Sequence, residues 1–118
     1  MLIFHAALPA DWADAVRDGR YMTSTRGATL DEVGFIHASR ASQLELVLDA
    51  FYADLDDLVL LHIDTDRLTS PWQLDDVPGS AEPFPHIYGP LDIEAVIQTT
   101  RLRRAAAGWG LPTAVAGH

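Results

Sequence analysis

The sequence lacks two residue types that carry much of protein chemistry, cysteine and lysine. Without cysteine the chain has no disulfide, no thiolate zinc site and no cysteine nucleophile. Without lysine it has no Schiff-base chemistry, no P-loop lysine and no lysine general base. Each of its eight basic side chains is therefore an arginine. What remains for catalysis is the chemistry of histidines, carboxylates and hydroxyl groups.

Long hydrophobic runs are also missing. No window approaches the roughly 20 apolar residues that a membrane span needs, and the N-terminal residues lack the basic region and apolar stretch of a signal peptide. We therefore expect a cytoplasmic protein that makes no use of a membrane. The length of 118 residues and the 48% of hydrophobic residues suit one compact domain. We place this domain at residues 1–104 and a weakly ordered tail at residues 105–118.

Positive charge is scarce, and it is unevenly distributed. Residues 1–100 contain all 17 acidic residues but only five arginines, a net charge of −12. Arg101, Arg103 and Arg104 then add three positive charges, which leaves −9 for the whole chain and allows a local basic patch at the end of the domain. Non-specific binding of nucleic acid by the acidic body is disfavoured.

The hydrophobic pattern predicts an α+β domain with a small, split, mostly antiparallel sheet and two helices. Pro9 and Gly19 mark the ends of one helix, and Ser39 precedes the other. Continuous apolar or β-branched runs indicate the strands, of which residues 58–63 are the expected central one. The expected helices are residues 9–18 and 40–52, and the expected strands are residues 2–6, 35–38, 58–63, 84–88 and 93–102. We expect residues 20–33 to form a surface loop and the proline-rich residues 69–85 an extended segment with a short edge strand at 72–74.

Four of the five histidines lie in or beside apolar, strand-like segments. Alternation along a strand puts His37 and Ser39 on one face of their strand, and His86 and Tyr88 on one face of another. If these strands and the one that carries His5 are neighbours, three imidazoles, a hydroxyl and a phenol converge in a cleft. The structural alternative is that each histidine is a partly buried residue with one satisfied hydrogen bond.

A metal site is a further alternative, because three histidines are a common catalytic zinc set. His5, His37 and His86 supply that number, but no pair of them has a spacing that lets one element present two ligands. We therefore assign no metal ligand and keep a histidine-based metal hydrolase as a third hypothesis. Glycine-rich dinucleotide loops, Walker loops and nucleophile elbows do not occur in the sequence.

Several short motifs, in this order over residues 2–102, resemble a known family. They are Ile3-Phe4-His5, Trp12, Gly34-Phe35-Ile36-His37-Ala38-Ser39, Gln43, Leu58-Val59-Leu60-Leu61-His62-Ile63-Asp64 and Phe84-Pro85-His86-Ile87-Tyr88-Gly89-Pro90-Leu91. They are similar to the small bacterial family called domain of unknown function 952, for which no activity is established. The resemblance implies a fold similar to that of the ADP-ribosyltransferase superfamily, above all its tRNA 2′-phosphotransferase branch.

The resemblance also implies roles for residues of the first two strands. His5 matches the histidine that binds the NAD ribose, and the backbone of Ala6 stands where a glycine usually contacts the nicotinamide amide. His37 and Ser39 match the position that holds the nicotinamide-side ribose. The implied ligand is NAD, as a substrate, or ADP-ribose, and the implied reaction is ADP-ribosyl transfer or NAD glycohydrolysis.

The third position of the pattern departs from the family. Relatives tend to have Trp-Glu where this chain has Trp72-Gln73, and a glutamine cannot act as a base. Glu82 or His86 would have to take over the role of that acid. The alternative is a non-catalytic ligand-binding or interaction module, which kept the scaffold and lost the acid at position 73.

The chemistry of such a pocket is consistent with the residues present. Cleavage of a nicotinamide–ribose bond passes through an oxocarbenium-like cation, so the pocket needs hydroxyl contacts, an aromatic platform and cations for the diphosphate. We expect a small-molecule nucleotide as the partner. For the acceptor we expect a small molecule or a protein rather than tRNA, because the acidic body disfavours a tRNA substrate. The assigned residues are His37 and His86 for catalysis, and His5, Ala6, His37, Ser39, Tyr88 and either Arg40 or Arg26 for binding.

Overall fold

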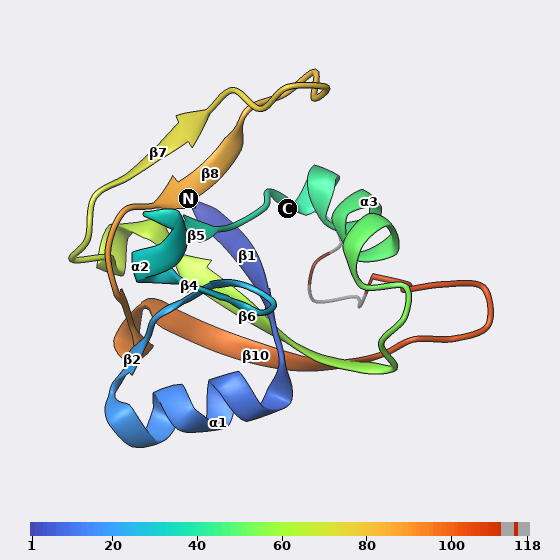
Figure 1. Cartoon of the computed structure of the whole chain (residues 1–118), viewed down its shortest axis with the longest axis horizontal. Coiled ribbons are helices and arrows are strands. Elements are labelled where there is room, and N and C mark those ends of the chain that lie inside the picture. Colours follow the sequence, from blue (N-terminus) through green and yellow to red (C-terminus); the bar gives the residue numbers. More distant parts are fainter. Residues whose placement is uncertain (112–114, 116–118) are drawn as a thin grey trace.

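The computed structural model describes residues 1–111 and 115, and it has two three-stranded antiparallel sheets. The first has the order β1 (Leu2–Ala7), β6 (Asp57–Asp64), β10 (Val96–Arg103). The second has the order β5 (Ile36–His37), β8 (Phe84–Ile87), β7 (Trp72–Asp75). The prediction of an α+β domain with mostly antiparallel strands is confirmed. Figure 1 shows the β7–β8 arm on one side of β1 and helix α3 on the other.

One pair of residues joins the two sheets across the split. Phe4 and Ser39 each donate a backbone hydrogen bond to the other's carbonyl, at 2.8 Å. β1 thus pairs with β6 along one edge and touches the segment after β5 along the other. This contact brings the end of β5 beside the middle of β1, which is where the candidate site lies.

The central strand is the one with the longest apolar run. β6 pairs with β1 on one side and β10 on the other, and its residues from Leu58 to Ile63 alternate between two buried faces. Leu61 and Ile63 pack into one core cluster and Leu58 and Leu60 into the other. A strand that is buried on both faces reads as a continuous hydrophobic run, so its central place was predictable.

The described residues contain three α-helices rather than the expected two. α1 (Pro9–Asp18) begins at a proline and ends at Gly19, whose φ of 87° suits a residue without a Cβ. α3 (Ala41–Phe51) corresponds to the helix expected at residues 40–52. The additional helix is the short α2 (Leu30–Val33), which is capped by reciprocal hydrogen bonds between Thr29 and Glu32.

Residues 20–33 are therefore not the plain surface loop that was expected. They form β2 (Arg20–Tyr21), β3 (Thr23–Thr25), β4 (Ala28–Thr29) and α2. β3 and β4 pair as a hairpin, and β2 pairs with β9 (Leu91–Asp92). These elements are too short to produce a hydrophobic period, so the sequence pattern does not reveal them.

The strand expected at residues 93–102 begins later than predicted. Residues 91–95 form β9 and a 3-10 turn, η2 (Ile93–Ala95), before β10 starts at Val96. A second 3-10 turn, η1 (Thr65–Arg67), follows β6. The edge strand expected at 72–74 is present as β7 and extends to Asp75.

The C-terminal segment packs against α3 as far as it is described. Trp109 is 2% exposed, its indole Nε1 donates to the Tyr52 carbonyl at 3.0 Å, and its backbone N–H donates to Asp49 Oδ1 at 3.2 Å. The weakly ordered tail expected at residues 105–118 includes residues 112–114 and 116–118, which lie outside the described residues. In the described part of the chain no helix has the length and apolar character to cross a membrane.

Candidate functional site

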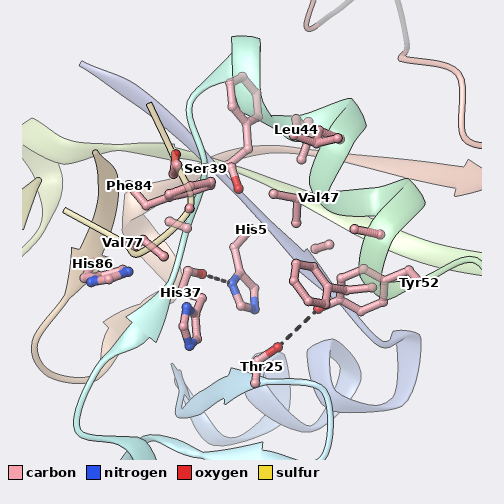
Figure 2. A pocket seen from close by; sticks show the side chains of 18 of the residues that line it. His5, Thr25, His37, Ser39, Leu44, Val47, Tyr52, Val77, Phe84 and His86 are labelled. Atoms are coloured by element: carbon pink, nitrogen blue, oxygen red, sulfur yellow. Dashed lines mark hydrogen bonds between the residues drawn. The ribbon is translucent and has the colours of Figure 1, made fainter. Parts of the chain in front are cut away.

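A cleft of about 690 Å³ opens between α3 and the segment that leads into β8. Its floor is formed by the middle of β1 and the end of β5, and Figure 2 shows His5 near its centre. Leu44, Val47 and Tyr52 come from the α3 side, while Val77 and Phe84 face them from the other. Its walls are thus predominantly apolar, as is usual for a site that takes a small molecule.

The two walls are connected near one end of the cleft by Gln43, in the first turn of α3. Its Oε1 accepts a hydrogen bond from the Arg40 backbone N–H at 2.9 Å, and its Nε2 donates to the Pro83 carbonyl at 2.8 Å. At the other end Tyr52 lies 3.5 Å from the Thr25 hydroxyl, oxygen to oxygen. These contacts fix the width of the cleft, since Gln43 and Tyr52 are both buried.

Two histidines face each other across the strands that form one wall. His37 of β5 and His86 of β8 are register partners, and their ring centroids are 5.3 Å apart in an edge-on arrangement. Phe35 stacks on His86 at 4.1 Å between ring centroids. Partial desolvation of the ring, followed by the nearby His86, lowers the pKa of His37 below its ordinary value, although the residue is exposed at the end of β5. His37 is therefore neutral at physiological pH.

His86 is paired with a carboxylate that sequence reasoning missed. Its Nδ1 lies 2.7 Å from Oδ2 of Asp75, and the hydroxyl of Tyr88 donates to the same oxygen. Gln73 donates from Nε2 to the other oxygen, Oδ1, at 2.6 Å. The Tyr88 hydrogen bond, with those from His86 and Gln73, holds the pKa of Asp75 below its usual value. Asp75 is thus an ionised carboxylate with both oxygens engaged.

The second nitrogen of His86 has a different environment. Nε2 is buried and has no hydrogen-bond partner among the residues that the structure describes. Most buried polar atoms in folded proteins are satisfied, so an exception at the wall of a cleft is notable.

His5 plays a structural part in this arrangement. Its Nδ1 hydrogen-bonds to the carbonyl of His37, as Figure 2 shows, so Nδ1 carries the ring proton. Its Nε2 accepts a hydrogen bond from the Tyr21 hydroxyl at 2.8 Å. Burial lowers the pKa of His5 to about 4. With both nitrogens engaged, the neutral ring ties β1 to β5 and β2.

The remaining predicted residues divide into two groups. Ala6 and Ser39 line the cleft together with the three histidines. Arg40 and Tyr88 do not line it. Arg40 is paired with Glu82 at 3.3 Å, and Tyr88 lies behind His86, against Asp75. The alternative cation, Arg26, makes a two-point contact with Asp54 at 2.7 and 3.0 Å.

The missing acid at position 73 has a structural explanation. Gln73 is the register partner of His86, and Asp75 lies two residues further along β7 on the same face. Asp75, which was not among the predicted residues, is the carboxylate that reaches His86, whereas Glu82 is paired with Arg40. The alternation of residues 73 and 75 along β7 was the sequence signal for the Asp75–His86 contact. This signal can be interpreted only when the register of β7 against β8 is known.

A three-histidine metal site is not formed. Both nitrogens of His5 are used inside the protein, which leaves His37 and His86. Across residues 1–111 and 115 no group of three or more histidine, aspartate or glutamate side chains is placed to hold a metal ion.

Comparison with known proteins points to one family. The family model described as protein of unknown function (DUF952) matches residues 6–99. A crystal structure of CC0527 from Caulobacter crescentus, a structural genomics target, has 28% identity and a TM-score of 0.84 over 98% of this chain and 99% of that one. A double mutant of CC0527 has a TM-score of 0.85 at 26% identity, with the same coverage. The solution structure of CC0527 has a TM-score of 0.75 at 28% identity, over 92% of this chain and 90% of that one. No curated protein matches the chain.

Proposed function

The chain belongs to the DUF952 family of proteins of unknown function, and we propose that its cleft binds a nucleotide of the NAD or ADP-ribose type. One observation carries the proposal. His86 lines an apolar cleft of about 690 Å³, has a buried imidazole nitrogen without a hydrogen-bond partner in the described part of the chain, and lies beside a second histidine, His37. A flat heterocycle with hydroxyl or amide donors matches both features of this site.

The size and lining of the cleft support a ligand with aromatic rings. Small-molecule sites have volumes of roughly 300–1,000 Å³ and mostly apolar walls with a few polar groups. Phe84 of β8 and the exposed Phe51 of α3 offer aromatic surface to the cleft. Either the nicotinamide or the adenine ring can pack against such surface, while a carboxamide or ribose hydroxyl donates to His86 Nε2.

The diphosphate of such a ligand needs cations, and two arginines lie near the ends of the cleft. Arg26 is next to Thr25 and Arg40 is next to Ser39, both of which line it. Each arginine is now held by a carboxylate, Asp54 and Glu82 respectively. Exposed ion pairs of this kind are worth little, so a phosphate group can replace the carboxylate at small cost.

The histidines also suit the implied chemistry, cleavage of the nicotinamide–ribose bond. In glycohydrolysis a water oxygen bonds to ribose C1′, the C1′–N bond breaks, and the electron pair stays with nicotinamide. His86 Nε2 takes the proton that the water loses. In ADP-ribosyl transfer an acceptor hydroxyl replaces the water. His37, edge-on to His86, supplies polar surface on the same wall.

Calorimetric titration with NAD and then ADP-ribose tests the proposal. We expect a micromolar dissociation constant for at least one ligand, which corresponds to a binding free energy of about −8 kcal/mol. His37→Ala and His86→Ala should each weaken binding at least tenfold. His62→Gln is the matched control, because His62 is a buried β6 histidine that bonds Thr100 away from the cleft. No heat from either ligand at millimolar concentration would refute the proposal.

A second candidate is a binding protein without turnover. The amide of Gln73 favours it, because Gln73 lies opposite His86 where relatives tend to have glutamate, and an amide is no base. Nicotinamide release from NAD separates the two candidates. Release by the wild-type protein supports catalysis, whereas tight binding with release only after Gln73→Glu supports the second candidate.

A further inference from the structure

The two nitrogens of the His86 ring have opposite environments. Nδ1 lies 2.7 Å from Oδ2 of Asp75. An ionised carboxylate only accepts hydrogen bonds, so Nδ1 carries the ring proton and donates it to Asp75. Nε2 is then an unprotonated lone pair, and it is buried without a partner in the described part of the chain.

The carboxylate that sets this tautomer is itself held in place from two sides. Gln73, on the same strand, donates to Oδ1 at 2.6 Å, and Tyr88, just after β8, donates to Oδ2. The ring of His86 is fixed by Phe35, which stacks on it, and by His37, which meets it edge-on. The titratable groups that face His86 are therefore Asp75, Tyr88 and His37.

We infer that Asp75 is a positioning residue, which keeps the ring proton on Nδ1 so that the buried Nε2 of His86, a residue that lines the cleft, is the free acceptor of the ring. Asp75 acts from behind the ring and does not line the cleft. Tyr88 and Gln73 keep the carboxylate turned towards Nδ1. The inference rests on the proposed function only in one respect, the identity of the water or hydroxyl group that gives a proton to Nε2.

This arrangement also restricts the chemistry of the ligand. A buried acceptor without a donor is costly, so the cleft favours a molecule that places an O–H or N–H group at Nε2. In the proposed reaction this group is the attacking water or acceptor hydroxyl. Its proton moves to Nε2 as its oxygen bonds to C1′, and the imidazolium that forms is stabilised by the charge of Asp75.

The tautomer can be measured without any ligand, by 15N NMR of the ring nitrogens in the free protein. We expect Nδ1 to give the protonated and Nε2 the unprotonated signal of a neutral ring. Asp75→Asn should reverse the pattern, because Gln73 holds the amide oxygen and turns the new NH₂ group towards Nδ1. Tyr88→Phe and the neighbouring, exposed Asp76→Asn are controls that should keep the wild-type pattern. A proton on Nε2 in the wild-type protein would overturn the inference.

Kinetics of nicotinamide release give an independent readout. Asp75→Asn should leave the dissociation constant of NAD within about twofold, whereas turnover should fall at least about 100-fold, as expected for loss of general base catalysis. An equal loss of binding and turnover would contradict a positioning role. If NAD does not bind at all, the proposed function fails, and the tautomer measurement alone decides the inference about Asp75.

Discussion

At the scale of single residues, His5 and His86 are both buried but use their nitrogens in different ways. Both nitrogens of His5 are bonded within the protein, to the His37 carbonyl and the Tyr21 hydroxyl. Burial raises the pKa of Tyr21, so its hydroxyl stays protonated and keeps donating to His5. One nitrogen of His86 is bonded, and the other has no hydrogen-bond partner among residues 1–111 and 115. His5 therefore contributes to stability, and His86 is the histidine that we propose to contact a ligand.

The pKa of His5 predicts how stability depends on pH. The folded-state pKa is about 4, below the unfolded value of 6.5, so the unfolded chain binds the extra proton first as the pH falls. The contribution of neutral His5 to the free energy of unfolding is fully present above pH 6.5. It is lost progressively between pH 6.5 and 4, by about 3 kcal/mol in all.

Urea unfolding at pH 7 and pH 4.5 measures this effect. His5→Gln lowers stability at pH 7 but removes this titration, so its stability should fall less between the two pH values than that of the wild-type protein. His37→Gln is the control for the loss of an exposed histidine and should keep most of the wild-type pH dependence. Equal pH dependence of wild type and His5→Gln would show that His5 is not the titrating group.

At the scale of elements, the site depends on strand register and on the position of α3. The pairing of β7 with β8 places Gln73 opposite His86 and brings Asp75 within reach of its ring. On the other wall, α3 is anchored at its start by Gln43 and at its end by the C-terminal segment, through Trp109. The cleft keeps its shape because Gln43 joins its two walls and Trp109 anchors the end of α3.

The contact between Trp109 and α3 predicts a large effect of truncation. Trp109→Ala removes a side chain that is 2% exposed and leaves the space beneath α3 unfilled, so the free energy of unfolding should fall by about 3–5 kcal/mol. Ile97→Ala on β10 is the control, because Ile97 is 50% exposed and should change stability by no more than about 0.5 kcal/mol. Similar denaturation midpoints for the two variants would contradict a docked C-terminal segment.

The elements that the sequence predicted are those with a hydrophobic period long enough to read. Residues 40–52 show a helical period and became α3, while residues 58–63 were recognised by a continuous apolar run instead and became β6. The hairpin β3–β4 and helix α2 span only a few residues each, and the signal for α2 was the capping pair Thr29 and Glu32. Alternation also predicted that His37 and His86 share a wall. It cannot predict that Asp75 joins them, since this needs the register of β7 against β8.

At the scale of the whole molecule, the net charge of −9 hides local neutralisation. The acidic residues 54–57 are paired with arginines from distant parts of the chain: Asp54 with Arg26, Asp56 with Arg104 and Asp57 with Arg101. The local basic patch considered at the end of the domain is thereby largely neutralised. A protein of this charge repels long polyanions, which favours a small nucleotide as the ligand.

One measurement tests the central claim most directly, the 15N signal of His86 Nε2 during a titration with NAD, and with ADP-ribose in a parallel sample. We predict that this signal moves as the ligand's donor group binds Nε2, and that it saturates at the dissociation constant found by calorimetry. The signals of His62, which lies outside the cleft, should stay unchanged. An unchanged His86 signal at saturating ligand, or no binding of either nucleotide, would contradict the account.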